Sequence, residues 1–291
     1  KPSETTIECN PDEITERFAD SISRLPVNRI SMGAQTFNDD RLKFLHRRHS
    51  SGDVKTAVDR LRYIGINNIS MDLMYGFPNE TINEWRKDIQ EAIRLEVEHI
   101  SAYSLMIEKG TPLYNMMESG KIKEIDVELS RQMYETLIVI VEDALFEHYE
   151  ISNFAKKGKR SQHNSSYWNS IHYLGIGAAA HSYDGESRQW NVSNINSYIN
   201  NIESGIIPAE KEILDLSTKY DDMITTALRT KEGININDLV KKFGIEYRNY
   251  LIENAKKYLD SNLMVIDNNK IRISRDGIFV SDAILRDLMH V

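Results

Sequence analysis

The chain has 291 residues, of which 41% are hydrophobic and 27% are charged, with a net charge of −8 at pH 7 and a single cysteine. The negative charge argues against a protein that binds nucleic acid or acidic membranes over a broad surface. No apolar run reaches the about 18 residues of a membrane span, and no signal-peptide pattern opens the chain, so we expect a cytoplasmic protein with no transmembrane segment. The lone Cys9 excludes an internal disulfide and any multi-cysteine metal site built by this chain alone.

The first half of the chain alternates β-rich runs with amphipathic helical patterns. We predict strands over residues 5–9, 29–34, 68–73, 99–104 and 148–152. Helices are predicted over residues 53–64, 81–95 and 126–144. Strands separated by helices pair in parallel through right-handed crossovers, which indicates an α/β sheet or barrel. Five strands do not close a barrel unaided.

Polar residues stand at or near the carboxyl end of each predicted strand, where α/β folds collect their chemistry. They are Glu8, Gln35, Asp72, Tyr103 with Ser104, and Ser152 with Asn153. One such residue indicates only a solvated loop start. Five in series predict a polar ligand site across the mouth of a barrel.

Residues 156–212 read as polar, aromatic-rich loops. Gly175 to Ala180 fits the GxGxxA pattern, but no β-run precedes it and no βαβ unit surrounds it, which argues against nucleotide binding. The histidines at 163, 172 and 181 are nine residues apart, a spacing of no common zinc site. A histidine among Tyr167, Trp168 and Tyr173 is either a hydrogen-bonding loop residue or a group that faces a flat macrocycle and ligates its iron.

From residue 213 to 291 the order helix, helix, helix, hairpin, helix is similar to a winged helix. This segment holds 12 basic and 12 acidic residues, a net charge of zero, whereas a DNA reader is normally basic. We therefore interpret it as a packing or partner-docking module and expect no nucleic-acid partner.

Several motifs together resemble the radical S-adenosylmethionine (SAM) family related to oxygen-independent coproporphyrinogen III oxidase. They include Thr6–Pro11, Asn28–Asn38, Asp72–Pro78 and His99–Leu105, and the likeness continues to the end of the chain. Within that family, Ser101–Ser104, Glu150–Phe154 and the HNxxYW motif at 163–168 are most similar to the haem-chaperone branch.

The resemblance implies a fold and a domain plan. The fold is a partial TIM-like radical SAM barrel with a small C-terminal winged-helix-like domain. The barrel would occupy residues 1–155, a loop-rich haem-motif segment 156–212 and the C-terminal domain 213–291.

The resemblance also implies a SAM site. Glu8 would face the methionine amino group, Arg47 its carboxylate and Asp72 the ribose hydroxyls, with Gln35 in the same pocket. The residues alone leave open a strand with a capped helix at Glu8 and a solvated basic helix end at Arg47. For haem, the motif implies His163 as an iron ligand, with Tyr167 and Trp168 lining the face.

The chain departs from this family at the iron–sulfur cluster. Members carry an upstream CxxxCxxC loop that ligates a 4Fe-4S cluster and a Gly-rich segment on the second barrel strand; neither occurs here. We therefore expect the chain as given to lack the cluster and radical chemistry, and to be a fragment of a longer parent that uses SAM, a 4Fe-4S cluster and haem.

Three functions follow as hypotheses. The first is a haem chaperone that binds haem and passes it to acceptor haemoproteins. The second is an enzyme that oxidatively decarboxylates coproporphyrinogen III to protoporphyrinogen IX in porphyrin biosynthesis. The third is a degenerate binding module that keeps the barrel without a cofactor.

Overall fold

Two structural units make up the chain, residues 1–161 and 162–291, and each is described by itself. The computed structural model describes residues 3–290. This division differs from the three segments expected from the sequence, whose boundaries stay a prediction. Among residues 3–290, no helix is both long and apolar enough to cross a lipid bilayer.

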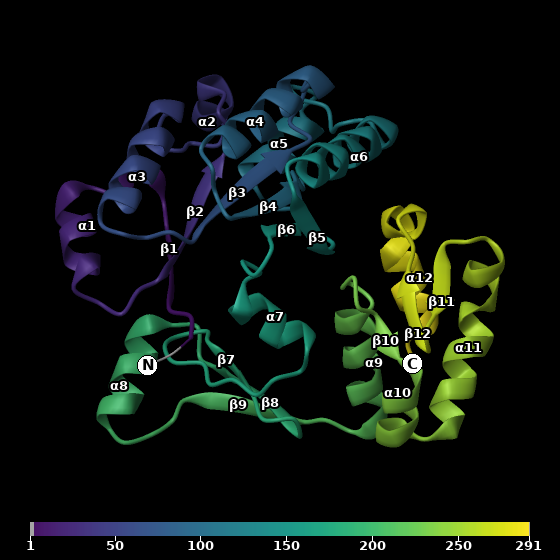
Figure 1. The fold of residues 1–291 in the computed structure, drawn as a ribbon. Helices are drawn as coiled ribbons and strands as arrows, with labels where there is room; N and C mark the ends of the chain where they lie inside the picture. Colours follow the sequence, from purple (N-terminus) through teal and green to yellow (C-terminus); the bar gives the residue numbers. More distant parts are fainter. Residues whose placement is uncertain (1–2, 291) are drawn as a thin grey trace. The chain divides into compact units, whose positions relative to one another are not determined.

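The first unit is built on a six-stranded sheet in the order β1-β2-β3-β4-β6-β5 (Figure 1). The strands are β1 Thr6–Cys9, β2 Arg29–Gln35, β3 Ile69–Tyr75, β4 His99–Ser104, β5 Phe146–Glu150 and β6 Asn153–Lys156. β1 to β4 pair in parallel, as the alternation of strands and helices predicts. The predicted α/β class is confirmed.

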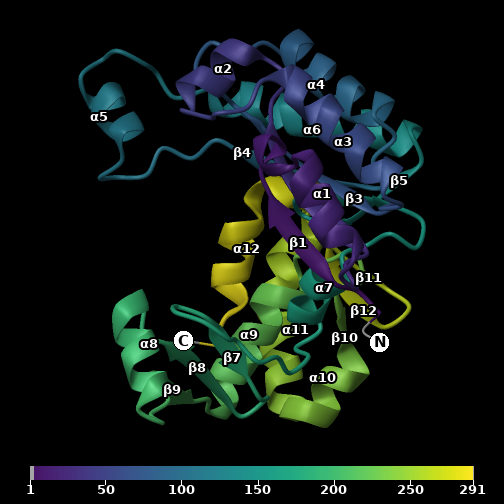
Figure 2. The ribbon, with the colours of Figure 1, turned by 90° about the vertical axis from the view of Figure 1, so that its left-hand side faces the viewer.

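Helices cover one face of this sheet. They are α1 Glu16–Ser23, α2 Asp39–Phe44, α3 Ser51–Tyr63, α4 Ile82–Arg94, α5 Pro112–Glu118 and α6 Val127–Asp143, with a short 3-10 turn at Pro11–Glu13. Figure 1 shows α3, α4 and α6 along the same side of the strands, whereas α5 stands away from the sheet in Figure 2. Tyr75 of β3 packs on Trp85 of α4, with ring centroids 5.2 Å apart, and both are buried.

The opposite face of the sheet carries the polar residues. On β3 the side chains alternate, as strand geometry requires, so Leu73 is buried among the helices and Asp72 points to the other side. This alternation leaves one face free for a ligand while the other forms the core.

The last part of the sheet differs from the prediction. β5 runs in the same direction as β4, but β6 lies between them and pairs antiparallel with both. The expectation of parallel pairing throughout was therefore wrong at this edge. The sequence 148–152 signals one strand, whereas the chain turns at Ile151–Ser152 and returns as a hairpin.

The second unit begins with more regular structure than the loops expected over 156–212. It contains α7 Gln162–Trp168, β7 His181–Tyr183, β8 Ser187–Asn191, α8 Ile195–Glu203 and β9 Ala209–Ile213. The three strands form an antiparallel sheet in the order β7-β8-β9. Short strands rich in Asn, Ser and Gly give a weak sequence signal, because their polar residues are also those of turns.

The C-terminal part has the element order of a winged helix. It contains α9 Leu216–Ala227, β10 Ile234–Asn235, α10 Ile236–Phe243, α11 Ile245–Asp260, β11 Met264–Asp267, β12 Lys270–Ile273, a 3-10 turn Asp276–Val280 and α12 Ser281–Leu288. Asn268 and Asn269 both have positive φ, the backbone that a two-residue hairpin turn needs. The predicted helices and hairpin are present; the two-residue β10 was not predicted.

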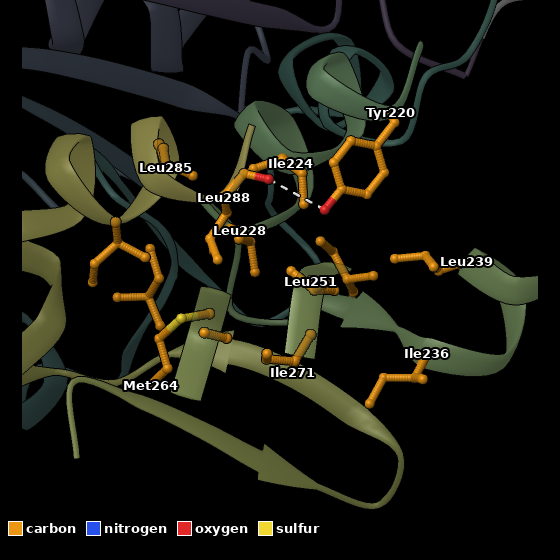
Figure 3. Packing of buried hydrophobic residues seen from close by; sticks show 14 of the residues in the cluster. Tyr220, Ile224, Leu228, Ile236, Leu239, Leu251, Met264, Ile271, Leu285 and Leu288 are labelled. Atoms are coloured by element: carbon orange, nitrogen blue, oxygen red, sulfur yellow. Dashed lines mark hydrogen bonds between the residues drawn. The ribbon is translucent and has the colours of Figure 1, made fainter. Parts of the chain in front are cut away.

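A single apolar core holds these elements together (Figure 3). Tyr220 of α9, Leu251 of α11, Ile271 of β12 and Leu288 of α12 are all fully buried or nearly so. The Tyr220 hydroxyl donates a 3.2 Å hydrogen bond to the Leu288 carbonyl, so its one polar atom is satisfied inside the core.

Candidate functional site

The first candidate site lies on the helix-free face of the first sheet, around Asp72. Asp72 on β3 is paired in register with Ser101 on β4, and hydrogen bonds from Ser101 and Ser31 reach its carboxyl group. Glu8 on β1 is close enough to raise the Asp72 pKa through its negative charge. Three neighbouring strands therefore bring together two residues that the sequence predicted for one pocket.

Burial controls the charge of Asp72. Desolvation raises its pKa to about 6, against the hydrogen bonds of Ser101 and Ser31, which favour the ionised form. The carboxylate is thus ionised above about pH 6 and can accept hydrogen bonds from two neighbouring hydroxyl groups, as a ribose would offer.

Gln35 stands at an irregularity at the end of β2. The register of β2 against β3 shifts between Met32 and Gln35, and Gln35 has a φ of 66°, so the strand bends and redirects this side chain. Its amide lies over Gly33: a Cβ at Gly33 would come within 2.8 Å of Gln35 Nε2. The glycine therefore makes room for the amide at the strand end.

Arg47 reaches the same edge of the sheet from the loop after α2. Its Nη1 donates a 3.0 Å hydrogen bond to Oδ1 of Asn10, the residue that follows β1. Arg47 is half-buried, and its planar guanidinium is suited to a carboxylate ligand. The structure places Arg47 at the end of β1, next to the strand that carries Glu8.

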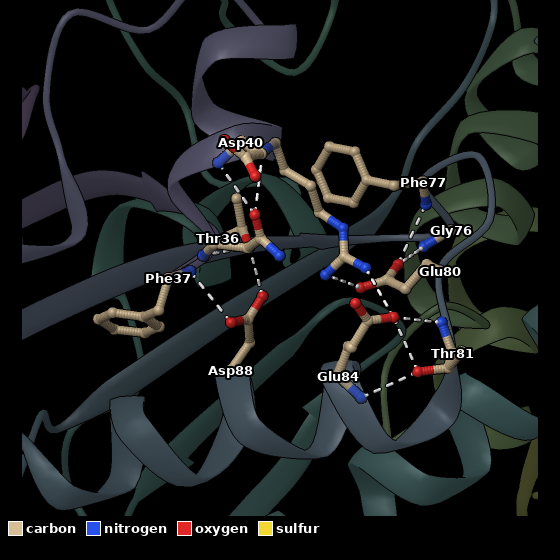
Figure 4. A network of polar contacts seen from close by, with 11 residues as sticks. Thr36, Phe37, Asp40, Gly76, Phe77, Glu80, Thr81, Glu84 and Asp88 are labelled. Atoms are coloured by element: carbon tan, nitrogen blue, oxygen red, sulfur yellow. Dashed lines mark hydrogen bonds and ion pairs between the residues drawn. The ribbon is translucent and has the colours of Figure 1, made fainter.

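Buried carboxylates fix the loop that follows Gln35 (Figure 4). Asp88 of α4 accepts hydrogen bonds from the Thr36 hydroxyl at 2.6 Å and from the Phe37 N–H at 3.0 Å. Asp88 is only 3% exposed. The helix layer thus holds the backbone on which Gln35 is mounted.

A second carboxylate fixes the loop that follows β3. Glu80 accepts hydrogen bonds from the N–H groups of Gly76 and Phe77, at 2.6 and 3.0 Å, and forms an ion pair with Arg41. Desolvation nevertheless raises the pKa of Glu80 to about 7, which the positive charge of Arg41 opposes. Arg41 also pairs with Glu84, so α2 and α4 are connected behind the site.

Asn153 belongs with this site but was not among the committed site residues. It lies opposite Ser101 on β6, it is 3% exposed, and its Oδ1 has no hydrogen-bond partner within residues 3–290. A buried polar atom without a partner normally indicates a missing ligand or water. Its position at a strand end was the sequence signal.

The second candidate site lies on α7 of the second unit. His163 and Tyr167 are one helical turn apart, with 3.0 Å between His163 Nε2 and the Tyr167 hydroxyl. The Tyr167 ring packs edge-on against Tyr173, with centroids 4.8 Å apart, and Tyr173 packs against Tyr183 of β7. The predicted pair is brought together as part of an aromatic cluster.

Trp168 is the predicted haem residue that the structure does not place in this cluster. Among the described side chains it makes no ring contact with His163 or Tyr167. Its indole Nε1 is buried without an acceptor in the described part of the chain. Consecutive helical residues point about 100° apart, which accounts for the different directions of Tyr167 and Trp168.

The remaining signals of this segment have packing explanations. A Cβ at Gly175 would come within 2.1 Å of the His181 carbonyl oxygen, and Gly177 has a φ of 110°. The GxGxxA pattern is thus needed for a close backbone approach and a turn. His172 packs on Tyr183 and His181 on Trp190, so the three histidines have separate surroundings.

The residues of this chain do not fit a cluster held by three thiolates. Cys9 is the one cysteine of the sequence, and burial raises its pKa to about 12, which disfavours the thiolate that iron requires. Among residues 3–290, no group of three or more His, Cys, Asp or Glu side chains is arranged to hold a metal ion.

Comparison with known proteins decides the family. Residues 2–92 match the Radical SAM superfamily and residues 214–280 match the HemN C-terminal domain. The chain is 30% identical over 278 residues to "Heme chaperone HemW" of Lactococcus lactis, an alignment that covers 94% of this chain and 72% of that protein. The chain belongs to the HemN/HemW-like radical SAM family.

Other members of this family are similar over most of the chain. "Heme chaperone HemW" of Bacillus subtilis is 37% identical over 83% of this chain and 64% of that protein. The zebrafish protein "Radical S-adenosyl methionine domain-containing protein 1, mitochondrial" is 28% identical over 99% of this chain and 67% of that protein. The chain thus spans about two thirds of the length of these relatives.

A solved structure shows the same fold. The Escherichia coli coproporphyrinogen III oxidase HemN, a radical SAM enzyme, matches with a TM-score of 0.80 over 99% of this chain and 70% of that one. The identity is 17%, so this likeness concerns the fold alone. It confirms the expected radical SAM fold with a C-terminal domain.

Proposed function

We propose that this chain is a radical SAM haem chaperone-like protein that binds haem as cargo and delivers it to haemoproteins. The observation that carries the proposal is the His163–Tyr167 pair with its 3.0 Å hydrogen bond on α7, within a motif that points to the haem-chaperone branch. Curated relatives at 30% and 37% identity bear the name of heme chaperones, which supports the same choice.

The surroundings of the pair suit a flat, apolar ligand with a metal at its centre. Tyr167 is 37% exposed and stacked edge-on against Tyr173, so one side of its ring is supported and the other is accessible. Ile171, Leu174 and Ile176 in the following loop are 53%, 78% and 81% exposed. Exposed apolar side chains beside a metal-binding residue offer a macrocycle both contact area and an iron ligand.

The first unit supports a SAM site in the same proposal. The family is a SAM and 4Fe-4S family, and Glu8, Gln35, Arg47 and Asp72 would hold SAM at the strand ends. The unpartnered Oδ1 of Asn153 fits an additional polar ligand on this face. No step is derived through the cluster, because its cysteines are not in this chain.

The preference for an iron-containing macrocycle tests the proposal. We expect haem to bind this chain at least tenfold more tightly than coproporphyrin III, the stable oxidised form of the oxidase substrate, because only haem offers iron to the α7 pair. Competition between the two, followed by the fluorescence of coproporphyrin III, measures the ratio. Equal or reversed affinities would contradict the chaperone function and favour the oxidase alternative.

Delivery is tested separately, with a haem-depleted b-type haemoprotein as the acceptor. The chain is loaded with haem, freed of excess and mixed with the acceptor, and the acceptor spectrum is followed. We expect the acceptor to fill. Retention of all haem on the chain would contradict the delivery step. The cytoplasmic location and the absence of a nucleic-acid partner stay predictions.

A further inference from the structure

The His163–Tyr167 pair has a geometry that bears on which atom binds iron. The two rings are nearly perpendicular, at 84°, with centroids 4.9 Å apart, and Nε2 of His163 is 3.0 Å from the Tyr167 oxygen. When Nε2 carries no proton, the phenol donates and the imidazole accepts. In this arrangement Nε2 is directed at Tyr167 and is engaged with it.

This geometry disfavours His163 Nε2 as the iron ligand. To bind iron, Nε2 would have to give up its hydrogen bond and the edge-on contact with Tyr167. The phenol oxygen keeps further capacity, because a hydroxyl has one donor and two acceptor positions and only the donor is used in the bond to His163. The oxygen can therefore bind a metal while His163 stays where it is.

We propose, on the basis of the haem function above, that Tyr167 ligates ferric haem through its phenolate oxygen and that His163 is a positioning residue that accepts the phenol proton. The O–H bond of Tyr167 breaks, a bond between that oxygen and the iron forms, and the proton passes to Nε2 of His163. No electron is transferred, and the resulting imidazolium stays hydrogen-bonded to the phenolate.

The chemistry of the two partners supports this assignment. A phenolate is a hard anionic donor, and tyrosine is an established axial ligand of ferric haem. A tyrosine is ordinarily protonated at neutral pH, so it needs a neighbouring base to act as an anion. His163, one turn earlier on α7, supplies that base at hydrogen-bond distance.

The support behind Tyr167 fits a ligand that must hold its direction. The ring rests edge-on against Tyr173, and Tyr173 exchanges two 2.9 Å backbone hydrogen bonds with Tyr183 of β7. The sheet therefore fixes the side of Tyr167 that faces away from the solvent. A ligand on a supported side chain loses less conformational entropy when it binds.

Resonance Raman and absorption spectroscopy of ferric haem bound to the chain test the assignment. We compare the wild type, Tyr167→Phe, His163→Gln and a control, Tyr63→Phe, whose side chain is 92% exposed on the first unit. The wild type and the control are expected to show phenolate vibrations and a phenolate-to-iron charge-transfer band. Tyr167→Phe is expected to lose both and to bind haem at least tenfold more weakly.

His163→Gln separates the two possible ligands. If Tyr167 is the ligand, this variant keeps the phenolate signature with reduced affinity, because glutamine still positions the phenol but does not take its proton. A wild-type spectrum in Tyr167→Phe that disappears in His163→Gln would overturn the assignment and leave His163 as the ligand. Absence of haem binding by the wild-type chain would instead contradict the proposed function. Far-ultraviolet circular dichroism of each variant checks that it is folded.

Discussion

The carboxylate of Asp88 and the hydroxyl of Thr36 are 52 positions apart in the sequence and 2.6 Å apart in space. The contact joins α4, which belongs to the helix layer, to the loop that starts at Gln35. Residues that make no contact with a ligand thereby determine where the strand-end residues stand (Figure 4). The site around Asp72 therefore depends on the packing of the helices behind it.

Removal of this contact should destabilise the first unit. Asp88→Ala leaves the Thr36 hydroxyl and the Phe37 N–H buried without their acceptor, which we expect to cost roughly 2–4 kcal/mol of unfolding free energy. Asp88→Asn retains one acceptor oxygen and should cost less. Urea unfolding measures both. A wild-type midpoint for Asp88→Ala would show that the contact does not stabilise the loop.

His99 should make the stability depend on pH. It is fully buried on β4, hydrogen-bonded to Ser70 and Tyr149 at 2.7 and 2.8 Å, and burial lowers its pKa to about 3, with the charge of Arg29 as a second cause. The unfolded histidine titrates near 6.5, so between pH 6.5 and 3 the unfolded chain binds a proton that the folded chain does not. Stability is fully present above pH 6.5 and is lost as the pH falls, by about 2 kcal/mol at pH 5.

The variant His99→Gln isolates this effect, since glutamine keeps hydrogen-bonding groups but does not titrate. We expect its unfolding free energy, measured in urea at pH 7.5, 6 and 5, to fall less with decreasing pH than that of the wild type. Parallel curves for the two proteins would show that His99 is not responsible.

Sequence patterns predict most of the first unit, and the reasons are physical. Long helices such as α4 and α6 have an apolar stripe and a capping residue, Thr81 or Asp126, so their positions are close to those predicted. The strands β1 to β4 are bounded by turn residues. The β5–β6 hairpin was missed because its turn at Ile151–Ser152 contains neither glycine nor proline, the usual signals.

The candidate sites were predictable to different degrees. Glu8 and Asp72 meet because parallel strands end at one edge, which is a rule of the fold. The fixing of the Gln35 loop by Asp88 was not predictable, because a long-range contact leaves no periodic pattern in the sequence. For the haem motif, helical spacing brings His163 and Tyr167 together and turns Trp168 away, a difference that the motif alone does not show.

Asp72 should govern the binding of SAM and its pH dependence. Asp72→Asn removes a charged acceptor, so we expect SAM affinity to fall by about tenfold to a hundredfold at pH 7.5. In the wild type, affinity should decrease as the pH falls below about 6, where Asp72 becomes protonated. Calorimetric titration at pH 7.5, 6.5 and 5.5 measures both, with the exposed Asp143→Asn as the control. Unchanged SAM affinity in Asp72→Asn would exclude Asp72 from the site.

Gly175 should be intolerant of a side chain. A Cβ there would meet backbone atoms of His181, so we expect Gly175→Ala to cost about 2 kcal/mol or more, because backbone must move. Gly52→Ala on α3 is the matched control: its nearest contact is 3.7 Å, and alanine is favoured in a helix. Thermal unfolding should show a lower midpoint for the first variant and an equal or higher one for the second. A neutral Gly175→Ala would contradict the close approach.

The most direct measurement of the central claim is a titration of this chain with ferric haem, followed at the Soret band, for the wild type and His163→Ala. The control is His46→Asn, an exposed histidine at a φ of 55°, a backbone that asparagine tolerates. We predict saturable binding with a shifted Soret band for the wild type and the control, and at least tenfold weaker binding for His163→Ala. No Soret shift in the wild type, or equal affinity in His163→Ala, would contradict a haem site on α7.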